Sequence, residues 1–178
     1  MRPKRVLIAY FSSGEDMTKD RLTGKRILAV DDEPDVLESL EEILSMCEIV
    51  KASRFEEAER LVQEQSFDIA ILDIMGVEGY RLLDMLRETD TITVMLTAHA
   101  FSPKETVKSF KKGAASYIPK EEMGNIALYL NDVLEAKEHG KHFWSRWLDR
   151  FASYYDEKFG PGWQDEDKEF WEKFKVWY

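Results

Sequence analysis

The stretch Phe67-Asp68-Ile69-Ala70-Ile71-Leu72-Asp73-Ile74-Met75-Gly76-Val77-Glu78-Gly79-Tyr80 decides the fold class of this chain. Its apolar core, Ile69 to Leu72, is short and rich in isoleucine, and it ends abruptly at an acidic residue. Such a run is typical of a strand that is buried on both faces of a parallel sheet. Open α/β sheets bind ligands at the carboxyl ends of their strands, so Asp73 is a candidate functional residue.

Composition limits the classes of function that need to be considered. The 178 residues are 44% apolar and 34% charged, which allows one ordinary domain with a buried core and a short appendage. The net charge of −10 disfavours nucleic acid as a partner, because phosphate backbones are bound by clustered Lys and Arg. The single Cys47 excludes an internal disulfide framework, and no stretch approaches the ~20 apolar residues that span a bilayer. We therefore expect a cytoplasmic location.

Strand and helix patterns alternate along residues 25 to 139. Each helix carries apolar residues at helical spacing, and Ser53 with Glu56 predicts a capping box at the start of the second one. Short units of this kind imply right-handed crossovers and a parallel sheet covered by helices on both faces. The predicted strands are Lys25 to Val30, Cys47 to Ala52, Phe67 to Asp73, Thr93 to Leu96 and Ser116 to Ile118.

Polar residues stand at the ends of four of these strands. Asp31 and Asp32 follow the first strand, Asp73 ends the third, Thr97 follows the fourth and Lys120 follows the fifth. Three carboxylates that are brought together repel one another and attract a divalent cation, and oxygen-only ligands favour Mg²⁺. Asp73 could then attack a phosphoryl group whose oxygens are bound by the Thr97 hydroxyl and the Lys120 ammonium group. Each residue alone is more often a cap, a turn or a solvated charge, so the hypothesis depends on the joint pattern.

As a set, four motifs resemble those of the response-regulator receiver domain of two-component signalling. They are Ile27-Leu28-Ala29-Val30-Asp31-Asp32-Glu33-Pro34, Ile71-Leu72-Asp73-Ile74-Met75, Val94-Met95-Leu96-Thr97-Ala98-His99, and Gly113-Ala114 through Tyr117 to Lys120. The resemblance covers residues 24 to 138 and implies a doubly wound five-stranded sheet of flavodoxin-like order 2-1-3-4-5.

The resemblance also implies roles for individual residues. Asp73 would accept a phosphoryl group from a histidine kinase or phosphotransfer protein, and Thr97 and Lys120 would bind its oxygens. Asp32, Asp73 and the main-chain carbonyl of Met75 would ligate Mg²⁺, with Asp31 acting mainly through water. Thr97 and Tyr117 would switch a surface that a downstream protein target reads.

Two loops depart from the family pattern. Met75-Gly76-Val77-Glu78-Gly79 is about two residues shorter than the usual loop after the acceptor and lacks its proline. Lys120 is followed by Glu121 where the family has a proline, usually with a cis bond. Because a cis bond before a residue other than proline costs ~3 kcal/mol, we expect a trans or rearranged turn there.

The chain is predicted to have three parts. An N-terminal extension (residues 1–24) contains a strand-like run from Val6 to Phe11, and a receiver domain covers residues 25–139. Residues 140–178 hold all five Trp and are expected to form two helices joined by a loop around Gly160. The aromatic residues of this tail could pack on each other or on the receiver, or they could form an exposed surface for a partner. Interleaved acidic residues disfavour a membrane surface, and a homodimer is left open.

Two other functions remain to be weighed against a phosphorylation switch. A receiver fold could serve as a scaffold that is never phosphorylated. An aspartyl-phosphate phosphatase of the haloacid-dehalogenase kind also places Asp, Thr and Lys at strand ends. It needs an Asp-x-Asp motif after the first strand, however, and here Asp31 and Asp32 are adjacent. We therefore expect a phosphoacceptor protein and not a conventional turnover enzyme.

Overall fold

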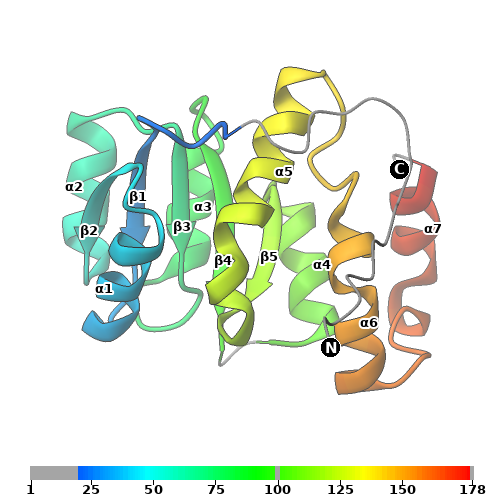
Figure 1. Cartoon of the computed structure of the whole chain (residues 1–178). Helices are drawn as coiled ribbons and strands as arrows, with labels where there is room; N and C mark the ends of the chain where they lie inside the picture. Colours follow the sequence, from blue (N-terminus) through cyan, green and yellow to red (C-terminus); the bar gives the residue numbers. More distant parts are fainter. Residues whose placement is uncertain (1–19, 99–100, 177–178) are drawn as a thin grey trace, which may run out of the picture.

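The computed structural model describes residues 20–98 and 101–176, in which five parallel strands form one sheet of order β2-β1-β3-β4-β5 (Figure 1). The predicted doubly wound sheet and its flavodoxin-like strand order are therefore confirmed. The strands are β1 (Arg26–Val30), β2 (Glu48–Ala52), β3 (Ile69–Leu72), β4 (Ile92–Thr97) and β5 (Ser116–Pro119).

The register of the sheet aligns the strand ends that carry the candidate residues. Leu72 of β3 pairs with Val30 of β1, so the residues that follow, Asp73 and Asp31, leave neighbouring strands at the same level. Thr97 pairs with Pro119, which places Lys120 directly after the partner of Thr97. Every residue of β3 and β4 is buried, as expected for strands that are covered on both faces.

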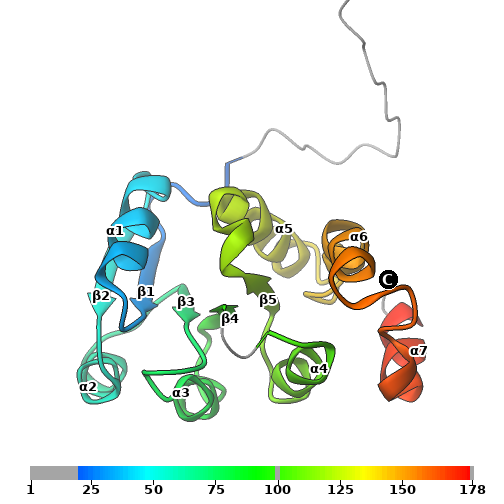
Figure 2. The same ribbon diagram turned by 90° about the horizontal axis from the view of Figure 1, so that it is seen from below.

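Five helices cover the sheet in two layers. Helices α1 and α5 lie on one face, and α2, α3 and α4 lie on the other (Figure 2). Their bounds are α1 (Pro34–Ile43), α2 (Phe55–Glu64), α3 (Gly79–Leu86), α4 (Pro103–Lys111) and α5 (Ile126–Glu138), and a 3₁₀ helix, η1 (Lys120–Asn125), precedes α5. Among the described residues, no helix is both long enough and apolar enough to cross a membrane.

The predicted capping box of α2 is wrong in its details. The residue that caps the helix is Arg54, whose side chain makes no capping hydrogen bond. The carboxylate that reaches back belongs to Glu57, which accepts a hydrogen bond from the Ser53 amide at 3.0 Å. The helix starts one residue later than the box requires, so Glu57 occupies the third helical position in place of Glu56.

The aromatic tail forms the two expected helices, α6 (Trp147–Phe159) and α7 (Lys168–Val176). They extend the molecule beyond α4, β5 and α5 (Figures 1 and 2). Six tail aromatic side chains are buried in the same hydrophobic core as the sheet: Trp147, Phe151, Tyr155, Trp163, Trp171 and Phe174. Of the two interpretations of the tail, packing of the aromatic residues on each other or on the receiver is therefore confirmed for these six.

Hydrogen bonds from tail side chains satisfy polar groups of the receiver. The Trp144 indole donates to the Ala114 carbonyl, and the Trp147 indole donates to the Tyr117 carbonyl, each at 3.0 Å. Aromatic side chains with a polar atom usually find such a partner when they are buried. The tail thus closes the edge of the sheet at β5, whose backbone would otherwise face solvent.

Several predicted features lie outside the described residues. These are the run Val6 to Phe11 with most of the N-terminal extension, His99 of the fourth-strand motif, and the two terminal residues Trp177 and Tyr178. The described end of the extension, residues 20–24, includes Leu22, which is fully buried in the core.

Candidate functional site

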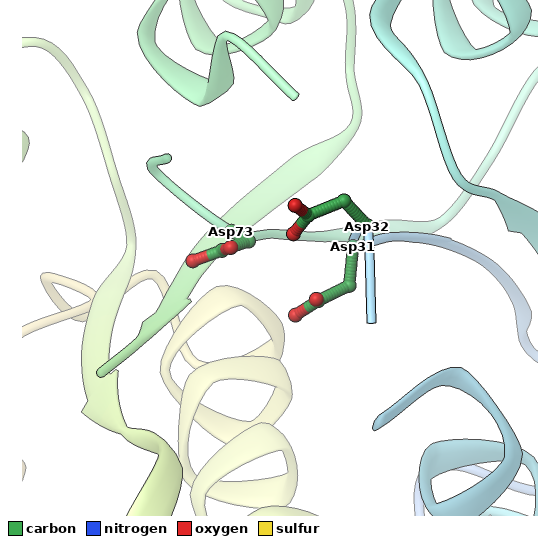
Figure 3. A group of neighbouring side chains, drawn as sticks. All are labelled: Asp31, Asp32 and Asp73. Atoms are coloured by element: carbon green, nitrogen blue, oxygen red, sulfur yellow. The ribbon is translucent and has the colours of Figure 1, made fainter. Parts of the chain in front are cut away.

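The three acidic residues meet at the carboxyl edge of the sheet, as the sequence predicts (Figure 3). Asp31 and Asp32 follow β1 and Asp73 follows β3. One carboxylate oxygen of each residue lies within 4.8 Å of one from each of the others. Parallel pairing of β1 with β3 produces this cluster, because it brings two strand ends to one point.

The backbone holds the two buried carboxylates in place. Asp31 accepts a hydrogen bond from the Glu33 amide at 2.9 Å, and Asp73 accepts one from the Ile74 amide at 2.9 Å. Both side chains are only 2% exposed, whereas Asp32 is exposed to solvent. Burial raises the pKa of Asp31, and burial together with the charge of Asp31 raises the pKa of Asp73. Keeping both buried carboxylates ionised therefore costs free energy, and a bound cation would offset that cost.

Lys120 lies among these acids. Its Nζ is 2.7 Å from Asp31 Oδ2 and 3.5 Å from Asp73 Oδ2. A further carboxylate, Glu33, lies 2.7 Å from the same Nζ. Burial alone would lower the pKa of Lys120, but bonds to Asp31 and Glu33 outweigh it and the pKa is raised. Lys120 is therefore a fixed positive charge beside the Asp73 carboxylate.

Thr97 reaches the site from the end of β4, where its side chain interacts with the Asp73 carboxylate and opposes the rise in the pKa of Asp73. The residue is fully buried, and its Oγ1 has no hydrogen bond of good geometry among the described residues. A buried hydroxyl without a well-aligned partner is costly, so Oγ1 suits an acceptor that arrives with a ligand. A phosphoryl oxygen bound between Asp73 and Lys120 would be such an acceptor.

The short loop after Asp73 is folded tightly against the carboxylates. Gly76 has a φ of +76°, and a Cβ at this position would lie 2.5 Å from Asp32 Cγ. Glu78, at φ 51°, adopts the left-handed conformation that side chains rarely take. The Met75 carbonyl, a predicted ligand of Mg²⁺, accepts a hydrogen bond from the Val77 amide at 2.9 Å. Its second lone pair remains available for a cation.

Tyr117, the predicted switch residue, is fully buried under the tail. Its ring stacks on Phe101 at a centroid distance of 5.9 Å, and burial raises the pKa of its hydroxyl. Among the described residues, no cis peptide bond occurs, and the chain enters a 3₁₀ helix at Lys120 directly after Pro119, which has ordinary extended backbone angles. The expectation of a trans turn at this position is therefore confirmed.

Two groups near the site were missed by sequence reasoning. Glu33 shares Lys120 with Asp31, and its only signal was its place directly after the acidic pair. Glu121 follows Lys120 and is held by Tyr154 and Lys158 of α6. Local sequence carries no signal for that contact, because the partners are more than 30 positions apart.

The family model of the response regulator receiver domain matches residues 27–129, which is more than half of the chain. The chain belongs to the response regulator receiver family. The four motifs that suggested the resemblance lie entirely within the matched range.

Curated relatives of this receiver chain are longer proteins. It is 35% identical over 127 residues to the two-component response regulator ARR18 of Arabidopsis thaliana, which covers 65% of the chain and 20% of that relative. It is 30% identical over 105 residues to the probable transcriptional regulator ycf27 of Guillardia theta, covering 57% of the chain and 41% of that relative. The chain thus spans one fifth to two fifths of these two proteins.

Solved receiver structures match a similar share of the chain. A CheY-like response regulator receiver domain protein of Methanospirillum hungatei JF-1 aligns with a TM-score of 0.60 and 28% identity, covering 66% of this chain and 98% of that one. The BeF3-activated DrrB receiver domain aligns with a TM-score of 0.53 and 26% identity over 61% of this chain and 94% of that one. An acidic pocket of Asp31, Asp32 and Asp73 beside Lys120 fits the Mg²⁺ site that is typical of receivers.

Proposed function

We propose that the protein is a phosphorylation-dependent response regulator of two-component signal transduction. Asp73 accepts a phosphoryl group from a histidine kinase or phosphotransfer protein, and the change is read by a downstream protein target. The observation that carries the proposal is the meeting of three carboxylates and Lys120 at one edge of the sheet.

The chemistry follows from the atoms that surround Asp73. Its Oδ1 is held by the Ile74 amide, so Oδ2, which faces Lys120, is the attacking oxygen. A bond forms between Oδ2 and phosphorus while the bond from phosphorus to the donor nitrogen breaks, and the donor histidine keeps the electron pair. Lys120 and the Thr97 hydroxyl bind the phosphoryl oxygens and stabilise their charge.

Mg²⁺ would be held by Asp32, Asp73 and the Met75 carbonyl, with Asp31 acting mainly through water. When bound, the ion neutralises the phosphoryl oxygens and reduces the repulsion between the carboxylates. The fit to this donor set rests on the buried, mutually repelling Asp31 and Asp73 and on the all-oxygen ligands of the cluster. Tyr117 and Thr97 are the proposed switch residues. The proposed location is the cytoplasm, which suits a phosphoacceptor whose single cysteine, Cys47, is a free thiol.

Incubation with a small acyl-phosphate donor and Mg²⁺ tests the proposal directly. Intact-mass spectrometry is expected to show one added phosphoryl group on the wild type and none on Asp73→Asn. Chelation of Mg²⁺ and the Asp32→Asn variant are both expected to slow the gain strongly. Failure of the wild type to gain mass would favour the alternative function, a receiver fold that acts as an unphosphorylated scaffold. Turnover of a small phosphate ester would favour the aspartyl-phosphate phosphatase.

A further inference from the structure

Helix α6 contacts both segments that leave the sheet beside the phosphorylation site. Phe101 lies in the loop that follows β4, the strand that ends at Thr97. Glu121 lies in η1, directly after Lys120. Thr97 and Lys120 are the two residues proposed to bind the phosphoryl oxygens. Helix α6 therefore contacts the segment of chain that follows each of them.

Both carboxylate oxygens of Glu121 are held by α6. The Tyr154 hydroxyl donates to Oε2 at 2.7 Å, and Lys158 Nζ donates to Oε1 at 2.9 Å. Tyr154 and Lys158 are four residues apart on the helix, so they lie on the same face and converge on one carboxylate. The Lys158 and Glu121 side chains are 44% and 63% exposed, so this contact is a modest restraint on the residue next to Lys120. The Lys120 ammonium group itself contacts Asp31 and Glu33.

Phe101 is enclosed by aromatic rings of the same helix. Its ring centroid lies 5.6 Å from Tyr154, 5.2 Å from Tyr155 and 5.2 Å from Phe159. Phe101 also stacks on Tyr117, whose backbone carbonyl accepts a hydrogen bond from the Trp147 indole. Movement of the loop after β4 would have to separate these rings.

We propose that Tyr154 and Lys158 are positioning residues for Lys120, and that docking of α6 and phosphorylation of Asp73 favour each other. The inference rests on the proposed function. Its physical basis is preorganisation: a group that is held in place before the phosphoryl group arrives loses less freedom when it binds. Because coupling between two binding equilibria is reciprocal, a phosphoryl group that engages Lys120 should in turn strengthen the contact between Glu121 and α6.

The contact also accounts for two unusual features of the sequence together. Lys120 is followed by a residue other than proline, and the chain carries an aromatic tail. In the structure, Glu121, the residue that stands in place of the proline, is the one that contacts the tail. A turn that lacks the rigidity of a proline is thus restrained from outside by Tyr154 and Lys158.

The test compares the double variant Tyr154→Phe, Lys158→Gln with the control Lys173→Gln. The control replaces a lysine of α7 whose ion pair with Glu169, at 2.6 Å, lies within the tail. We expect phosphorylation of Asp73 by an acyl-phosphate donor with Mg²⁺ to be about twofold slower in the double variant and unchanged in the control, the size of effect that an exposed ion pair allows. The conservative variant Lys158→Arg, which keeps the charge, should retain most of the wild-type rate.

A second measurement separates positioning from simple support of the fold. Hydrogen exchange of α6 amides is compared with and without Mg²⁺ and beryllofluoride, a mimic of the phosphoryl group. Added protection of α6 is expected in the wild type and in Lys173→Gln, but not in the double variant.

The outcomes are distinguishable. A wild type that gains phosphate while the double variant matches the control in rate and protection would overturn the positioning role alone. A wild type that gains no phosphate would refute the proposed function, and the coupling with it. Loss of folded structure in the double variant, seen by circular dichroism, shifts the comparison to Lys158→Gln alone, for which a smaller loss of rate is expected.

Discussion

Gly76 is the residue at which the short loop after Asp73 meets the acidic pocket. Its φ is +76°, and a Cβ atom attached to it would lie 2.5 Å from Asp32 Cγ, which leaves no space for a side chain. The loop can lie this close to Asp32 only because position 76 is glycine. A substitution here would therefore act on the metal site as well as on the backbone.

We expect Gly76→Ala to weaken Mg²⁺ binding about tenfold, because the new methyl group displaces the Asp32 carboxylate. Isothermal titration calorimetry measures the affinity. Gly140→Ala is a matched control, since Gly140 also has a positive φ, of +63°, but nothing lies within 4 Å of its Cβ position. Equal Mg²⁺ affinities in the two variants would contradict the expected contact.

Asp73 supplies a prediction about stability and pH. Burial and Asp31 raise its pKa in the folded state, so the folded protein binds this proton more tightly than the unfolded chain. The free energy of unfolding therefore falls as pH rises from the pKa of Asp73 in the unfolded chain to its raised pKa in the folded protein. The cost of the buried charge is present in full at neutral pH. Asp73→Asn removes that cost and keeps an acceptor for the Ile74 amide.

In metal-free buffer at pH 7, Asp73→Asn should therefore raise the free energy of unfolding by about 1 kcal/mol. The gain should shrink as pH falls toward 4, because the wild-type carboxyl group then becomes protonated. Urea unfolding at both pH values, with a chelator present, measures the difference. The control Asp90→Asn changes an exposed residue and should show no gain at either pH. A gain that grows toward low pH would contradict the sign of the shift.

Helices α6 and α7 both pack aromatic side chains into the core, and α6 also makes polar contacts with the receiver. Helix α6 is joined to α5 by a two-point ion pair, in which Arg150 contacts both carboxylate oxygens of Asp132 at 2.7 and 3.0 Å. Helix α7 depends on aromatic packing: the Phe174 ring lies 4.9 Å from Trp144 and 5.4 Å from Phe110 of α4. The position of α7 should therefore be sensitive to the loss of a single ring.

Phe174→Ala is expected to lower the free energy of unfolding by about 3 kcal/mol, because Phe174 is 1% exposed and its removal leaves a cavity. Val176→Ala changes the same helix at a residue that is 82% exposed, and should cost less than about 0.5 kcal/mol. Chemical denaturation of both variants measures the contrast. Similar losses in the two would show that α7 does not depend on this contact.

At the scale of the whole molecule, the sheet and the tail share one hydrophobic core. Tyr155 of α6 is fully buried and exchanges a hydrogen bond with Thr106 of α4 at 2.6 Å. Leu22, from the described end of the N-terminal extension, belongs to the same core. The predicted boundaries after residues 24 and 139 mark changes of sequence character, and described residues on both sides of each boundary belong to one hydrophobic core.

Thermal unfolding should consequently occur in one transition. All five Trp lie in the tail, so Trp fluorescence follows the tail, whereas far-ultraviolet circular dichroism follows the helices of the whole chain. We expect the two signals to give the same midpoint, as cooperative single domains do. An earlier fluorescence transition would show that residues 140–178 unfold as a separate unit.

The sheet and the acidic pocket could be predicted from the sequence because their signals are local. The run Ile69 to Leu72 identifies a buried strand, and the polar residues after successive strands must meet at one edge of a parallel sheet. The spacing of the tail aromatic residues likewise predicted helices. It did not determine which surface they cover, because a helical stripe packs equally well on another tail helix, on the receiver or on a partner.

What the sequence by itself determined about this protein is its set of strands, their polar ends and the two irregular loops. Only the tertiary structure decided that Glu33 shares Lys120, 87 positions away, and that Tyr154 and Lys158 hold Glu121. The physical reason is that each of these contacts joins polar side chains far apart in the sequence. The residues next to each one in the sequence would equally allow it to point into solvent. Packing of distant elements in the folded chain selects one arrangement for them.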